Sequence, residues 1–213
     1  MRLIGMLDSP YVRRVAVVMI QAKVPLAHQP ISLFRHIDQF SKVNPLLKAP
    51  TLITDEGTAL MDSNVILAYL ADTYPTVAAL TPPDSIRRLH AFRELGVALT
   101  VMEKAVQRHY ERLLRPEDKR HDPWIDRVMA QLSAGLATLD AETPRSGWIG
   151  DDVGLADISV ACACAFVRDT LSDLVDASRY SNLLAFWERA EALPAFRAAP
   201  PEDGATAVAA LPY

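Results

Sequence analysis

VNPLLKAPTLITDEGTALMDSNVILAYLADTYP, residues 43–75, is the stretch whose pattern decides the fold. Two apolar runs, 51–54 and 58–61, are separated by Asp55-Glu56-Gly57, which has the composition of a tight hairpin turn. The apolar residues that follow recur at the spacing of one helix face: Val65, Ile66, Tyr69 and Leu70. The stretch therefore predicts an antiparallel hairpin followed by a helix that ends at Tyr74-Pro75.

The residues before this stretch alternate between extended and helical patterns. Arg2 to Leu7 and Leu26 to Leu33 are predicted strands, and an apolar stripe that begins at Val12 predicts a helix between them. His36 to Val43 predicts a short helix that Pro45 closes. The resulting order, βαβαββα, indicates a small α/β layer with a mixed sheet.

The residues after this stretch change in character. Pro75 to Asp84 is rich in proline and small residues, which is typical of a linker. Every strong pattern beyond it is helical, with Ser85 and Asp122 as the expected caps of the first two helices. Three more helices are expected over 154–169, 181–192 and 194–198, and the tail after Pro200 is expected to be poorly ordered. We therefore expect an N-terminal domain over 1–76, a linker over 77–84 and an all-helical domain over 85–213.

Composition narrows the classes of function. The 213 residues are 50% hydrophobic and 23% charged, the balance of a globular protein. A net charge of -4 gives no basic footprint for nucleic acid, and no apolar run is long enough to span a membrane, so we expect a cytoplasmic chain. Cys162 and Cys164 lie two apart in a predicted helix, where they cannot bridge, and neither belongs to a metal-ligand cluster.

Four stretches resemble motifs of the glutathione transferase superfamily, in its bacterial type with a serine at the start of the first helix. They are SPYVRRV (9–15), the opening stretch, GLADISVACA (154–163) and YSNLLAFWERAEALPAF (180–196). The resemblance implies an α+β fold: a thioredoxin-like domain followed by an all-α domain. It also implies a homodimer that takes glutathione as co-substrate and adds its thiolate to a small hydrophobic electrophile, without a metal.

Ser9 has two interpretations. Ser9-Pro10 before an apolar-periodic helix is a good capping sequence. The resemblance places the same hydroxyl against the glutathione sulfur, where a donor favours the thiolate and lowers the pKa of the thiol. The two roles are compatible. Tyr11 is a possible second donor, although its position in the helix directs it elsewhere.

The resemblance also assigns residues that bind the rest of glutathione. It implies a cis Ala49-Pro50 bond that presents the backbone of Ala49 to the cysteinyl part. Asp62 and Ser63 stand at a helix N-terminus, which suits the γ-glutamyl group, although either could simply cap the helix. Lys48 is expected to pair with the glycyl carboxylate.

Two departures from the family pattern leave alternatives open. Leu47 stands where glycine is frequent, and Gly154 replaces the Ser or Thr that opens the capping box with Asp157. A closed ligand site would indicate a non-catalytic interaction module similar to stringent starvation protein A. An intact site would also suit a glutathione-dependent lyase or dehalogenase. Maleylacetoacetate isomerase is not favoured, because the Ser-Cys cluster of that branch is absent.

Overall fold

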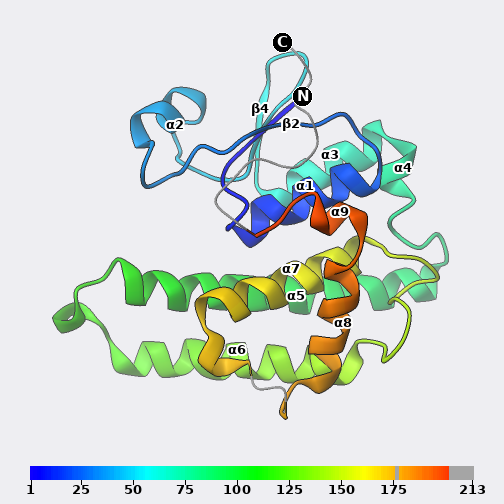
Figure 1. Cartoon of the computed structure of the whole chain (residues 1–213). Coiled ribbons are helices and arrows are strands. Elements are labelled where there is room, and N and C mark those ends of the chain that lie inside the picture. Colours follow the sequence, from blue (N-terminus) through cyan, green and yellow to red (C-terminus); the bar gives the residue numbers. More distant parts are fainter. Residues whose placement is uncertain (176–177, 202–213) are drawn as a thin grey trace. The chain divides into compact units, whose positions relative to one another are not determined.

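The computed structural model describes residues 1–175 and 178–201, and nearly all of the tail expected to be poorly ordered lies outside these residues. The chain forms two compact units. The first contains residues 1–81 together with residues 191–201, and the second contains the described residues of 82–190 (Figure 1). The second unit is thus an insertion in the sequence of the first.

A four-stranded mixed sheet organises the first unit. Its strands are β1 (Arg2–Ile4), β2 (Ala27–Gln29), β3 (Thr51–Ile53) and β4 (Ala59–Met61), in the spatial order β2-β1-β3-β4. The pair β1–β2 is parallel, whereas β1–β3 and β3–β4 are antiparallel. The predicted hairpin and sheet type are confirmed, but the first two strands are shorter than expected. β1 ends where Gly5 takes a φ of +136°, a conformation that breaks the extended run.

The helices of the first unit follow the predicted order. They are α1 (Pro10–Gln21), α2 (Ile37–Val43), α3 (Ser63–Thr73), α4 (Pro75–Ala78) and α9 (Pro194–Arg197). α1 contacts α3, β1 and α9, so it is central to this unit (Figure 1). The short helix α4 was not expected, because the stretch from Pro75 to Asp84 has the composition of a linker. Proline fits the first turn of a helix, where its missing N–H needs no partner.

The second unit is helical, as predicted. It contains α5 (Ser85–Leu113), α6 (Asp122–Glu142), α7 (Leu155–Thr170) and α8 (Ser181–Glu191), with single 3-10 turns η1 (Glu117–Lys119) and η2 (Ser172–Leu174). α5 packs against both α6 and α7. These long helices confirm the all-helical interpretation of the second half of the chain.

Two of the expected caps are wrong by one residue. Asp84, and not Ser85, caps α5, with its carboxylate accepting from the N–H groups of Ile86 at 3.1 Å and Arg87 at 2.9 Å. Asp122 is the first helical residue of α6 and His121 is the N-cap. Aspartate is stabilising in a first helical turn as well as at the N-cap, so composition alone does not separate the two positions.

Asp157 fixes the start of α7. Its two carboxylate oxygens accept from the N–H of Gly154 at 2.9 Å and of Ile149 at 2.8 Å. Gly154 contributes no side chain to the box, so only the aspartate half remains. Burial raises the pKa of Asp157 to about 6. Cys162 and Cys164, further along α7, are buried and form no disulfide within the described residues.

Candidate functional site

The register of the sheet brings three predicted site segments to one edge. Ile4 pairs with Thr51, and Thr51 pairs with Met61. Because both pairs are antiparallel, the carboxyl ends of β1 and β4 and the amino end of β3 lie at the same edge of the sheet (Figure 1). The segments that leave this edge carry Ser9, Ala49-Pro50 and Asp62-Ser63.

Gly5 allows the loop after β1 to pack closely at this edge. A Cβ atom at Gly5 would lie 2.6 Å from Cγ2 of Val12 and 3.2 Å from Cβ of Ala49. Its carbonyl oxygen is 2.8 Å from Nε2 of His28. Burial lowers the pKa of His28, so the neutral ring donates from Nε2–H to Gly5. Gly5 was not among the predicted site residues, although a glycine between a predicted strand and a helix was the available signal.

Ser9 occupies the N-cap position of α1, as predicted. Its backbone is extended, with φ -74° and ψ 123°, and its carbonyl accepts from the N–H of Arg13 at 2.9 Å. Within the described residues its hydroxyl makes no capping hydrogen bond. The expected role of the side chain as a cap is therefore wrong. Ser9 places a partly exposed hydroxyl at the positive end of a helix. Tyr11, in the first turn of α1, is half-buried.

The loop before β3 is held by a buried asparagine. The Ala49-Pro50 bond is cis, as the resemblance implies. Nδ2 of Asn44 donates to Oγ1 of Thr51 at 2.9 Å, and Oγ1 of Thr51 donates to the carbonyl of Lys48 at 2.6 Å. The backbone of Lys48 is thereby fixed while its side chain is exposed. Asn44 lies within the opening motif, but this role was not predicted for it.

Leu47 adopts the conformation that glycine would supply. Its φ is +49°, in the left-handed region that costs a residue with a side chain roughly 1–2 kcal/mol. The leucine side chain packs against the buried cluster of Ile4, Ile31 and Phe40, which offsets part of that cost. Although Leu47 departs from the family pattern, it keeps the left-handed turn before Lys48.

Asp62 and Ser63 begin α3. Asp62 has a φ of +67°, and its Oδ1 accepts from the N–H of Asn64 at 2.9 Å, so the capping interpretation holds for one of its two oxygens. Ser63 is buried, and its Oγ accepts from Nη1 of Arg14 at 2.9 Å. The same Nη1 donates to Oδ1 of Asn64 at 2.8 Å. Arg14 was not predicted to take part, and the signal available was a basic residue within an otherwise apolar helix stripe.

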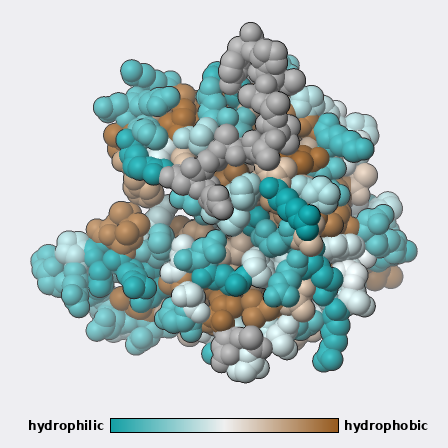
Figure 2. Space-filling view, viewed as in Figure 1, coloured by the Kyte–Doolittle hydropathy of each residue, from teal (hydrophilic) through white to brown (hydrophobic). Residues whose placement is uncertain are grey.

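The described residues contain neither a group that could hold a metal ion nor a helix that could cross a membrane. No group of three or more His, Cys, Asp or Glu side chains in 1–175 and 178–201 could hold a metal ion. In the same residues, no helix has the length and the apolar character needed to cross a membrane. Figure 2 shows a viewed face that is largely hydrophilic, with separate hydrophobic patches.

Family models match most of the chain. The model for the N-terminal domain of glutathione S-transferase matches residues 3–82, and the model for the C-terminal domain matches residues 122–189. The chain belongs to the glutathione S-transferase family. The family membership and the fold expected from the four motifs are confirmed.

Relatives and solved structures of this family are similar over most of their length. Maleylacetoacetate isomerase of Pseudomonas aeruginosa is 31% identical over 175 residues, which cover 76% of this chain and 74% of the relative. A glutathione S-transferase of Methylobacillus flagellatus, solved with glutathione bound, has a TM-score of 0.85 and 28% identity, covering 94% of this chain and 99% of that chain. A glutathione transferase family member of Pseudomonas fluorescens, with bound S-(propanoic acid)-glutathione, has a TM-score of 0.79 and 30% identity, covering 95% and 100%.

Proposed function

We propose that this chain is a glutathione transferase that binds glutathione at the sheet edge and adds its thiolate to a small apolar electrophile. The observation that carries this proposal is the register Ile4–Thr51–Met61, because it gathers the segments of Ser9, Ala49 and Ser63 at one place. The family membership and the glutathione-bound solved structures support the same ligand.

Each part of glutathione has a candidate partner. The backbone of Ala49, at the cis bond just before β3, pairs with the cysteinyl backbone as a neighbouring strand would. The γ-glutamyl carboxylate binds the Ser63 hydroxyl and the free N–H groups of the first turn of α3. Asp62 retains one oxygen outside its cap for the γ-glutamyl ammonium. The exposed Lys48 pairs with the glycyl carboxylate.

Ser9 acts on the sulfur in this proposal. Its hydroxyl donates to the thiolate, and the positive end of α1 stabilises the same charge. The thiolate then attacks an electrophilic carbon of the second substrate and forms the new carbon–sulfur bond. Ser9 makes no covalent bond, because its hydroxyl serves only as a hydrogen-bond donor. Tyr11 is the second candidate donor.

Titration with glutathione tests the proposal directly. Saturable heat is expected from isothermal titration of the purified chain, with weaker binding for Asp62→Ala. A hydrogen bond to a charged group contributes about 1.5–3 kcal/mol, so Ser9→Ala is expected to raise the pKa of the bound thiol by roughly 1–2 units. The ultraviolet absorbance of the thiolate, followed against pH, measures this pKa. The absence of binding at millimolar glutathione would sink the proposal.

Glutathione-dependent isomerisation is the second candidate. The 31% identity to a maleylacetoacetate isomerase favours it, although the first turn of α1 lacks the Ser-Cys cluster of that branch. Isomerisation begins with addition of the same thiolate and ends with its release, so a single assay of products separates the two reactions. Retained glutathione in the product indicates transfer, whereas regenerated glutathione indicates isomerisation. Lyase or dehalogenase chemistry would release a leaving group from the substrate.

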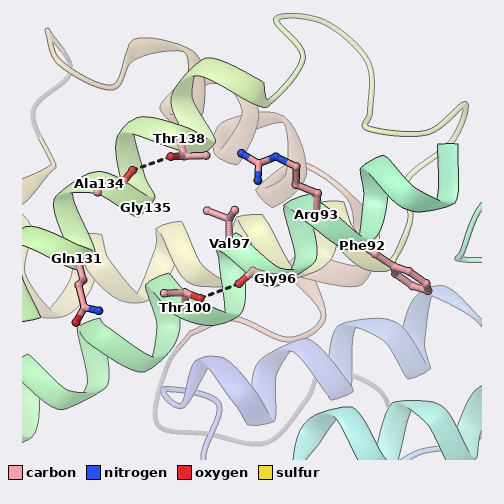
Figure 3. A pocket seen from close by; sticks show the side chains of 9 residues that line it. All are labelled: Phe92, Arg93, Gly96, Val97, Thr100, Gln131, Ala134, Gly135 and Thr138. Carbon is pink, nitrogen blue, oxygen red and sulfur yellow. Dashed lines mark hydrogen bonds between the residues drawn. The ribbon is translucent and has the colours of Figure 1, made fainter. Parts of the chain in front are cut away.

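We also propose that the chain forms a homodimer through the face between α5 and α6. A groove of about 640 Å³ opens there, and Figure 3 shows the side chains that line it. The hydroxyls of Thr100 and Thr138 donate to carbonyls of their own helices at 2.9 Å, so these residues offer their methyl groups to the groove. Exposed apolar side chains continue along α5 at Leu89 and Phe92. A two-fold interface uses the same patch of both subunits, so one face must carry both a groove and the side chains that fill the partner's groove.

Gly96 offers a clean test of this interface. A Cβ at Gly96 would meet nothing within 4 Å, so Gly96→Arg fits the single chain while filling the groove. Sedimentation is expected to show a dimer for the unaltered chain and a monomer for Gly96→Arg, with no loss of helix by circular dichroism. Leu113→Arg, at an exposed position of α5 outside the groove, is the matched control and keeps the dimer. A monomeric unaltered chain would contradict the dimer.

A further inference from the structure

Arg14 is a charged side chain in the interior of the first unit. It lies on α1 and is 0% exposed. Burial of a guanidinium is unfavourable unless hydrogen bonds compensate for the lost water. Its Nη1 meets the first two residues of α3, with 2.9 Å to Oγ of Ser63 and 2.8 Å to Oδ1 of Asn64. The two segments are 49 and 50 residues apart in sequence.

The contact decides the direction of the Ser63 hydroxyl. A guanidinium can only donate, so Oγ of Ser63 must accept from Arg14. The single O–H proton of Ser63 is then directed to another acceptor. Oδ1 of Asn64 is likewise committed to Arg14, which turns its amide group away from the guanidinium. Because Arg14 binds the acceptor oxygens of Ser63 and Asn64, the first turn of α3 presents hydrogen-bond donors to a ligand.

The charge of Arg14 adds to this polarity. The guanidinium is permanently protonated, and a buried charge acts over a short range with little screening by water. The guanidinium binds the Ser63 hydroxyl, and an anion that binds the same hydroxyl would therefore lie close to this charge. The N-terminus of α3 carries a positive partial charge at the same place.

We propose that Arg14 is a positioning residue for the γ-glutamyl carboxylate, because it holds Ser63 and Asn64 from α1 so that the start of α3 donates to that anion. The inference rests on the proposed function. α1 also begins at Ser9, so one helix carries the group that meets the sulfur and the group that orders the carboxylate site. Arg14 touches neither the thiol nor the electrophile in this assignment.

The test compares glutathione with 4-aminobutanoyl-cysteinyl-glycine, which lacks only the γ-glutamyl carboxylate. Arg14→Met is expected to weaken binding of glutathione about 10-fold or more in isothermal titration and to change binding of the analogue less than about 3-fold. A merely structural role would weaken both ligands equally. Arg14→Lys keeps the charge on a shorter side chain without the planar guanidinium, and it is expected to show a smaller selective loss if Arg14→Met fails to fold.

Arg13→Met is the matched control, since Arg13 is a buried arginine of the same helix and its guanidinium binds Glu191. The control is expected to leave the ratio of the two affinities unchanged. Equal loss for both ligands, or unchanged binding of glutathione in Arg14→Met, would overturn the role of Arg14. Failure of the unaltered chain to bind glutathione at all would instead overturn the proposed function.

Discussion

Arg13 donates to both carboxylate oxygens of Glu191, at 2.6 and 2.7 Å, although 178 residues separate the two positions. Nε of Arg13 also donates to the carbonyl of Ala199 at 2.8 Å, and its guanidinium lies 5.3 Å from the ring centre of Phe196. These contacts fix the segment of α9 on α1, which explains why residues after 190 cluster with the first unit.

Glu191→Ala is expected to destabilise the chain by about 3 kcal/mol, because it removes a carboxylate that binds the buried guanidinium of Arg13 at two points. Urea unfolding followed by circular dichroism measures the change. Glu188→Ala is the control, since Glu188 is an exposed carboxylate of the same helix, and it is expected to change stability by less than about 0.5 kcal/mol. Equal effects of the two substitutions would contradict the anchoring role.

Gly5→Ala is expected to destabilise the chain by about 3 kcal/mol or more, since the new Cβ would overlap Cγ2 of Val12 and the backbone would remain at a positive φ. Gly57→Ala has a positive φ of +85° but open space around its Cβ. It is expected to cost only about 1 kcal/mol. Thermal unfolding of both variants separates steric overlap from backbone strain. Similar losses of stability in the two variants would show that the close packing at Gly5 does not contribute to stability.

Glu94 makes the stability of the second unit depend on pH. Glu94 is buried on α5, and burial first and then the neighbouring carboxylate of Glu142 raise its pKa to about 8. Arg93 binds both oxygens of Glu142, at 3.0 and 2.6 Å, and lowers the pKa of that carboxyl. Asp157 contributes a further negative charge. The folded chain therefore keeps a proton on Glu94 that the unfolded chain releases above its ordinary pKa of 4.5.

The stabilisation from this proton is complete below pH 4.5 and is lost as pH rises towards about 8. Asp157 acts in the same direction, but only up to about pH 6. Between pH 6.5 and 8 the free energy of unfolding is expected to fall by up to about 1.4 kcal/mol per pH unit. Glu94→Gln, which resembles the protonated acid, should remove this slope, whereas Glu103→Gln at an exposed position of α5 should keep it. A slope that survives in Glu94→Gln would contradict a neutral Glu94.

Ser9→Cys is expected to react with glutathione disulfide at the site itself. The new thiolate would attack one sulfur of the disulfide, form a mixed disulfide with one glutathione and release the other as a thiolate. Mass spectrometry should find one adduct per chain, formed faster than in Ser41→Cys, whose position on α2 is exposed. The unaltered chain should remain unmodified, because Cys162 and Cys164 are each 1% exposed. Equal rates in the two variants would argue against the placement of Ser9 at the sulfur.

Local patterns predicted the elements better than their ends and their contacts. The hairpin after Pro50 and the helix that begins at Ser63 follow from turn composition and apolar spacing, which are properties of neighbouring residues. The end of β1 at Gly5 depends on how closely α1 and Ala49 approach. That approach is a tertiary property.

The same local patterns could not predict that Arg13 and Arg14 are buried. Arg13 and Arg14 stand beside each other in SPYVRRV, where a charged pair is usually exposed. Their partners are Glu191 in one case and Ser63 with Asn64 in the other, at sequence separations that periodicity does not link. The candidate site was thus predicted at the residues expected to face the ligand, while the residues that support them emerged only from the three-dimensional contacts.

The division of the first unit into two stretches of sequence has a consequence for synthesis. A ribosome produces residues 1–81 and then the whole of 82–190 before it adds Glu191 and Ala199, the partners of Arg13. Domains generally fold as units as they emerge. The thioredoxin-like unit of the nascent chain therefore lacks these partners of Arg13 until the whole of 82–190 has been made, and α9 packs on α1 only after the helical unit has appeared.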